Sequence, residues 1–90
     1  MSEQAVIFHV ILDEGFDLDE VEAGLESVAA EQNAEYDGNE LAVDGSEAIL
    51  YLDGSDADAL FDAAAPVVRR AAIKSGSHAR KRYGSADDPA

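Results

Sequence analysis

Apolar and β-branched residues fill positions 5–12 almost without interruption (AVIFHVIL), and Asp13-Glu14-Gly15 follows as a turn. A run of this length and composition, closed by turn residues, predicts a buried strand instead of a helix. Side chains alternate along a strand, so the run has two faces. One face carries Val6, Phe8, Val10 and Leu12, and the other carries Ile7, His9 and Ile11. We therefore place this strand in the centre of a sheet.

Residues 17–32 show a helical period. Asp17 followed by Glu20 is an Asp variant of the capping box, which favours a helix start at this point. Helical spacing gathers the apolar residues on one face. They are Leu18, Val21, Leu25, Val28 and Ala29. Gly24 lowers the helix propensity, and we expect it to mark a point of close packing.

Residues 41–52 predict a β-hairpin. Its strands are Leu41–Val43 and Ser46–Leu52, and Asp44-Gly45 between them suits a two-residue type I′ turn. In that register Leu41 lies opposite Ala48. One face then carries Leu41, Val43, Ala48, Leu50 and Leu52, and the other carries Glu40, Ala42, Glu47, Ile49 and Tyr51. This consistent sorting supports the register.

The C-terminal third predicts a second helix and a last strand. Ser55 is the expected N-cap of the helix, with Asp58 three residues later. Ser75-Gly76-Ser77 forms a turn, and the charged residues of His78–Tyr83 are typical of an edge strand. We expect residues 1–90 to be a single domain with an ordered core of about 5–84. The polar residues 85–90 are expected to be a disordered tail.

The element order is therefore strand, helix, strand, strand, helix, strand. This is the order of the ferredoxin-like βαββαβ split fold, in the α+β class. Right-handed crossovers then place both helices on one face of a four-stranded antiparallel sheet with strand order 4-1-3-2. The first and third strands are central in this arrangement, in agreement with their apolar character.

One part of the chain resembles a known group of proteins. The matching features are Leu50-Tyr51-Leu52-Asp53-Gly54-Ser55-Asp56-Ala57, Leu60-Phe61, Pro66-Val67-Val68-Arg69 and a closing Arg82-Tyr83-Gly84. Over Asp53–Gly84 the chain resembles a small group of uncharacterised bacterial and archaeal α/β proteins that close in Arg-Tyr-Gly. The resemblance implies an α/β fold. The group has no established activity, so it implies no mechanism.

Composition excludes several classes of site. The chain has no Cys, which rules out disulfides, Cys-ligated zinc, iron–sulfur clusters and thiol nucleophiles. No apolar run reaches the ~18–20 residues of a membrane helix, and no signal peptide is visible, so we expect a cytoplasmic protein with no membrane partner. Two His side chains show no diagnostic spacing for a metal. No catalytic motif is found, and we expect a non-enzymatic protein without a cofactor or metal.

The chain is strongly acidic, with 20 Asp and Glu against 6 Lys and Arg and a net charge of -14. Three interpretations remain open. Salt-loving microbes have Asp-rich, Lys-poor cytosolic proteins of this kind, and a high-GC organism can encode an ordinary acidic protein. The third interpretation is a functional acidic surface that imitates the charge of a nucleic acid.

The charges are also unevenly distributed. Residues 1–68 carry 18 acidic side chains and no Lys or Arg, and every basic residue lies in Arg69–Arg82. Either this segment neutralises acidic neighbours or it forms an anion site. A nucleic-acid-associated protein that uses Arg69–Arg82 is therefore the alternative function. The absence of the aromatic pattern of RNA-binding sheets opposes it.

The main functional hypothesis concerns the sheet face that the helices leave uncovered. It is expected to carry Ile7, His9, Ile11, Ile49, Tyr51, His78, Arg80 and Arg82. A face with an apolar centre and a His/Arg border is typical of a surface that is covered by a partner. Two interpretations remain: homodimerisation with two sheets face to face, or the binding of a small ligand.

Overall fold

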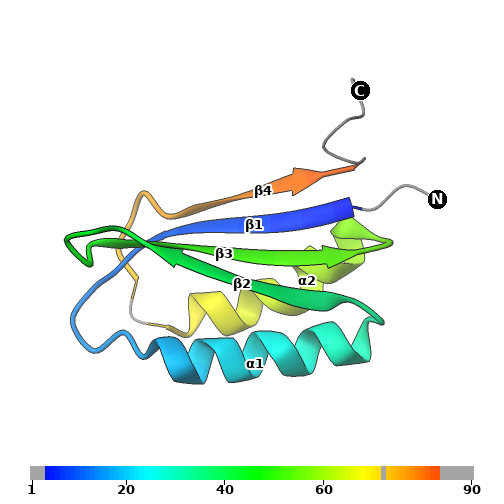
Figure 1. The fold of residues 1–90 in the computed structure, drawn as a ribbon, viewed down its shortest axis with the longest axis horizontal. Coiled ribbons are helices and arrows are strands. Elements are labelled where there is room, and N and C mark those ends of the chain that lie inside the picture. The colour runs from blue at the N-terminus through cyan, green and yellow to red at the C-terminus, as the bar shows by residue number, and fades with distance from the viewer. Residues whose placement is uncertain (1–3, 72, 84–90) are drawn as a thin grey trace.

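The computed structural model describes residues 4–71 and 73–83 and contains six regular elements (Figure 1). They are β1 (Gln4–Ile11), α1 (Leu18–Glu31), β2 (Glu35–Leu41), β3 (Glu47–Gly54), α2 (Ala57–Arg69) and β4 (His78–Arg82). This is the predicted order. The predicted tail, residues 85–90, lies outside the described residues.

The four strands form one antiparallel sheet in the order β2-β3-β1-β4. Read from the other edge, this is the predicted order 4-1-3-2, and the ferredoxin-like prediction is confirmed. Both helices lie on the same side of the sheet, with α1 below β2 and β3 in the view of Figure 1. The opposite face of the sheet is the open face.

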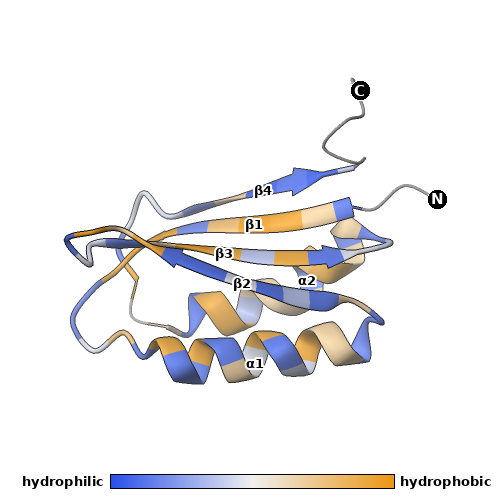
Figure 2. Ribbon diagram, in the orientation of Figure 1, coloured by the Kyte–Doolittle hydropathy of each residue, from blue (hydrophilic) through white to orange (hydrophobic). Residues whose placement is uncertain are grey.

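The core lies between the sheet and the two helices. Alternate residues of the central strands point into it, with Val6, Val10, Leu50 and Leu52 at most 2% exposed. From the helices, Leu25 and Leu60 meet them at 0% and 1% exposure. In Figure 2 the apolar colours accordingly concentrate on β1, β3 and the sheet-facing sides of the helices. The predicted strand phases are therefore correct for the core.

The hairpin has the predicted pairing of Leu41 with Ala48, but two of its details differ. The turn is shifted by one residue from the predicted Asp44-Gly45: the N–H of Gly45 donates to the carbonyl of Ala42, so Val43 and Asp44 are the central residues, and neither has the positive φ that type I′ requires. The carboxylate of Asp44 instead accepts hydrogen bonds from the backbone N–H and the hydroxyl of Ser46. Val43, predicted to face the helices, is fully exposed because the hairpin extends beyond the end of α1 (Figure 1).

Strand β2 spans Glu35–Leu41, so it begins well before the predicted strand Leu41–Val43 and also ends before it, at Leu41. A bulge between Tyr36 and Gly38 shifts the register, and Gly38 has φ 101°. Because of the extra residue, Tyr36 and Asn39 both lie on the helix side. This strand lacks the apolar run that identifies β1.

The predicted N-cap residue is correct for α1 and wrong for α2. Asp17 is the N-cap of α1, and its carboxylate accepts a hydrogen bond from the backbone N–H of Glu20 at 3.2 Å. The N-cap of α2 is Asp56, whose carboxylate accepts from the N–H of Ala59 at 3.1 Å. The prediction of Ser55 was wrong by one residue. Asp and Ser are comparable caps, and only the local backbone direction distinguishes them.

Candidate functional site: the open face of the sheet

The open face is formed by the alternate residues of all four strands that point away from the helices. The structure places the eight predicted residues on this face. Strand β1 contributes Ile7, His9 and Ile11, β3 contributes Ile49 and Tyr51, and β4 contributes His78, Arg80 and Arg82. The sequence therefore identified the central and basic parts of the face, because side chains alternate between the two faces of a strand and the phases assigned to these three strands were correct.

Pairing across the sheet arranges the open face in rows perpendicular to the strands. From β2 to β4, one row contains Glu40, Ile49, His9 and His78, the next contains Gly38, Tyr51, Ile7 and Arg80, and a third contains Glu35, Asp53, Ala5 and Arg82. Acidic side chains thus lie at the β2 edge and basic ones at the β4 edge. Between them lie apolar, aromatic and imidazole groups in the first two rows, and Asp53 with Ala5 in the third.

The centre of the face is only partly open to solvent. Ile7 retains 7% exposure, since its cross-strand neighbours Tyr51 and Arg80 are larger and lie on either side of it. The rings of His9 and His78 are stacked, with centroids 4.7 Å apart and planes inclined by 6°. His9, Ile49 and Tyr51 are half-buried, whereas His78 and Arg80 are exposed. The sheet itself thus supports these side chains in fixed rows.

A hollow of about 190 Å³ opens on this face near the hairpin. It is lined by His9, Glu40, Leu41, Ala42, Glu47, Ala48 and Ile49. Its walls combine an apolar floor at Ile49 with two carboxylates, those of Glu40 and Glu47. Neither carboxylate forms an ion pair with the part of the chain that the structure describes. The hollow therefore suits a small group that is cationic or donates hydrogen bonds.

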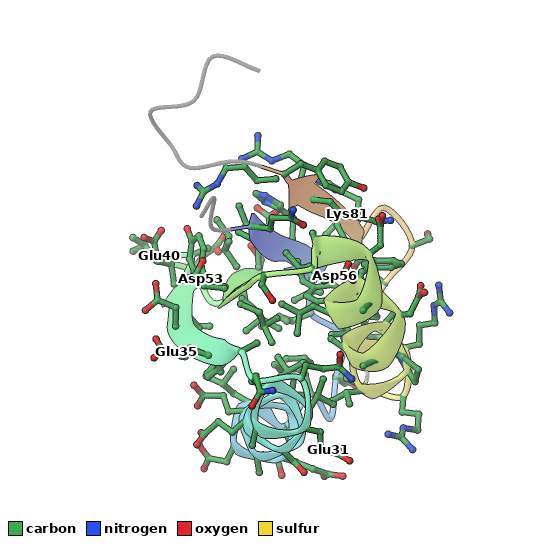
Figure 3. All side chains as sticks on the ribbon, turned by 90° about the vertical axis from the view of Figure 1, so that its right-hand side faces the viewer. Glu31, Glu35, Glu40, Asp53, Asp56 and Lys81 are labelled. Atoms are coloured by element: carbon green, nitrogen blue, oxygen red, sulfur yellow. The ribbon has the colours of Figure 1, made fainter. Side chains whose placement is uncertain are left out.

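Basic residues of the segment 69–82 do not share one surface. Arg69 ends α2 and Arg70 follows it, at the opposite end of the molecule from the C-terminal end of β4 (Figure 1). Arg80 lies on the open face, whereas Lys81 points to the helix side and contacts the Asp58 carboxylate at 2.8 Å. In Figure 3, Lys81 lies on the α2 side of the sheet, and the labelled carboxylates of Glu35 and Glu40 lie on the other side.

The Asp58 carboxylate is the centre of a small cluster that holds β4 against α2. It accepts hydrogen bonds from Lys81 at 2.8 Å and from the Tyr83 hydroxyl at 2.7 Å. These bonds lower the pKa of Asp58 and raise that of Tyr83. The Lys81 ammonium also lies 4.9 Å from the centroid of the Phe61 ring. Lys81 is thus used within the fold to neutralise an acid.

A second polar cluster, which the sequence did not predict, joins β2 to α1. The Glu22 carboxylate accepts hydrogen bonds from the Tyr36 hydroxyl at 2.9 Å and from the Asn39 amide at 2.7 Å. Burial raises the pKa of Tyr36 to about 12, and Glu22 acts in the same direction while the Asn39 bond opposes it. The sequence feature that could have indicated this arrangement is Asp37-Gly38 within a polar strand, since a glycine inside a strand often marks a bulge.

The helix side also contains an apolar crevice of about 170 Å³ between α2 and β4. Its lining includes Phe8, Phe61, Val68, Arg69 and His78. Elsewhere, no group of three or more metal-ligating side chains lies together in residues 4–71 and 73–83. Within the same ranges, neither helix has the length and apolar character needed to cross a membrane.

Comparisons with known proteins give a fold relationship. No protein-family model matches the chain, and no curated protein matches its sequence. The chain is similar to a solved structure described as the structure of Rv0793 from Mycobacterium tuberculosis, with a TM-score of 0.61. The match covers 99% of this chain and 100% of that one at 15% sequence identity. At this identity the likeness concerns the fold alone.

Proposed function

We propose that this protein is a non-enzymatic interaction module that forms a homodimer through the open face of its sheet. The observation that carries the proposal is the contrast between the two sheet faces. Both helices pack on one face, while the other presents Ile49, Tyr51 and the stacked His9 and His78 between two edges of opposite charge. Apolar and aromatic groups at the centre with charged groups at the rim are typical of protein interfaces.

The available area is sufficient for a stable dimer. The chain has 5580 Å² of accessible surface. A specific interface buries at least about 1,000 Å² in total, which is about a tenth of the surface of each copy. One face of a four-stranded sheet provides that area. A second copy is also a partner that is always present at the same concentration as the protein itself.

Light scattering after gel filtration tests the proposal. The parent protein should have the mass of a dimer, and Ile49→Lys or Tyr51→Glu should have the mass of a monomer. Both positions are half-buried and lie on the face away from the core, so circular dichroism should show a retained fold. Glu26→Lys, on the exposed side of α1, is the matched control and should remain dimeric.

A parent protein that remains monomeric at millimolar concentration would contradict the proposal. The open face would then be examined as a ligand site, because the hollow beside Glu40 is of a size to accept a small molecule. Titration with small anions, small cations and RNA, followed by amide shifts, separates these ligands. Shifts with RNA that include both Arg80 and Arg69 would support the nucleic-acid alternative.

A further inference from the structure

We infer that the two-fold axis of this dimer runs parallel to the strands, midway between β1 and β3. The inference rests on the proposed function and adds the arrangement of the partner. Strand β4 of each copy then lies over β2 of the other, and β1 lies over the partner's β3. The basic edge of one open face meets the acidic edge of the next.

A face-to-face dimer of two sheets with aligned strands has a two-fold axis in the plane between them, either along the strands or across them. Rotation about an axis across the strands places β2 over the partner's β2. Glu35 and Glu40 would then face the acidic edge of the second copy, and Arg80 would face its basic edge. Rotation about an axis along the strands exchanges the two edges. Like charges that face each other weaken association. The row pattern therefore selects the axis along the strands.

An axis along the strands also determines which rows meet. Rotation about this axis leaves the position along the strand unchanged, so each row faces the same row of the second copy. His78 then lies over the partner's Glu40, and His9 lies over the partner's Ile49. The hollow lined by Glu40, Ile49 and His9 is therefore the receiving site for the exposed His78 ring of the partner subunit.

Arg80 has a matching position in the next row. It lies over the partner's Gly38, where an added Cβ would meet nothing within 4 Å. Glu35 and Glu40 flank that glycine along β2. In the described part of the chain, none of the side chains of Arg80, Glu35 and Glu40 has an ion-pair partner. Because Gly38 has no side chain, it leaves room for a guanidinium, and the carboxylates of Glu35 and Glu40 supply the hydrogen-bond acceptors.

Cross-linking between engineered cysteines tests the axis, because the natural chain has no Cys to give a background. Glu40→Cys and His78→Cys are made separately, mixed, and treated with the short reagent bismaleimidoethane, since packed sheets lie about 10 Å apart. The mixture should give a covalent dimer. Either variant alone should give much less, because strands at opposite edges are about 14 Å apart laterally. Glu26→Cys mixed with His78→Cys is the control and should remain uncross-linked.

Charge reversal gives an independent measurement on the same pair. Glu40→Lys should weaken dimerisation about tenfold, since the change acts at both symmetric contacts. Adding His78→Glu to that variant should restore the dissociation constant to within about threefold of the parent. Glu26→Lys should leave the constant unchanged.

The outcomes separate the inference from the proposed function. A monomeric parent contradicts both. A dimeric parent in which Glu40→Cys cross-links to itself, or in which the mixture does not cross-link, overturns the axis and leaves the open-face dimer in place. A dimer whose dissociation constant is unchanged by Glu40→Lys likewise overturns the axis. Cross-linking in the mixture together with recovery in the double variant supports it.

Discussion

Gly24 of α1 lies so close to Val67 of α2 that a methyl group at Gly24 would be 2.7 Å from Cγ1 of Val67. Real side chains do not approach each other at this distance, so the glycine sets how near the two helices pack. Its low helix propensity, visible in the sequence, is the cost of this contact. Val67 is β-branched and has one strongly preferred rotamer in a helix, so it cannot easily turn away.

The first prediction is that Gly24→Ala destabilises the parent but stabilises a Val67→Ala variant. In the parent, overpacking costs about 1–3 kcal/mol and exceeds the helix-propensity gain of about 1 kcal/mol. With Val67 shortened, the clash disappears and only the gain remains. Urea unfolding of the four proteins measures the change of sign. If the effects of the two substitutions on the free energy of unfolding simply add, the helices accommodate a methyl group at position 24 without cost.

The limits of sequence reasoning are clearest in β2. Strand β1 was predicted with the correct faces because its apolar run identifies it, and Val10 is buried as expected. Strand β2 was predicted too short because its side chains are polar. Its polar groups are satisfied by a helix far away in the sequence, as with Tyr36 and Glu22. Local pattern does not contain that information.

The same limit applies to the open face. Its centre and basic edge followed from alternation in three strands. Its acidic edge depends on pairing across β3, including the bulge at Gly38 that brings Glu35 and Glu40 onto this face. The hairpin register had already predicted Glu40 on this face, whereas the contribution of Glu35 to the acidic edge is a property of the pairing and was not predicted.

The second prediction concerns the core position Val10, which is 2% exposed between the sheet and the helices. Val10→Asp buries a charge without a partner and should cost several kcal/mol of a total stability of about 5–15 kcal/mol. Thermal unfolding followed by circular dichroism measures the loss. Val43→Asp, at a fully exposed position, is the control and should melt with the parent. A Val10→Asp variant that melts within a degree or two of the parent would show that the strand phase is wrong.

The third prediction follows from the raised pKa of Tyr36. This pKa is about 12 in the folded protein against an ordinary value of 10.0. Between these values the unfolded chain binds fewer protons at this residue than the folded protein does. The contribution of Tyr36 to stability is thus complete below pH 10 and is lost as the pH rises towards 12.

Phenolate absorbance at 295 nm tests this directly, because the chain has only three tyrosines. Tyr36→Phe should remove the ionisation step near pH 12, whereas Tyr83→Phe should leave that step in place. The parent should also lose stability more steeply than Tyr36→Phe between pH 10 and pH 12. If the step near pH 12 persists in Tyr36→Phe, that step does not belong to Tyr36, and burial does not raise the pKa of its hydroxyl as described.

The last prediction concerns salt. Helix α1 carries acidic side chains along its exposed side with no Lys or Arg, and Glu22 and Glu26 are four residues apart, where like charges repel. Thermal midpoints should therefore rise as KCl increases towards molar concentration, since salt screens this repulsion. Glu26→Gln should raise the midpoint by about 1–3 °C at low salt, and the gain should shrink in molar KCl. Lys81→Gln removes a cation beside Asp58 and should lower the midpoint at low salt. A midpoint that is flat or falls with KCl would mean that the carboxylates are too widely spread for their repulsion to affect the fold.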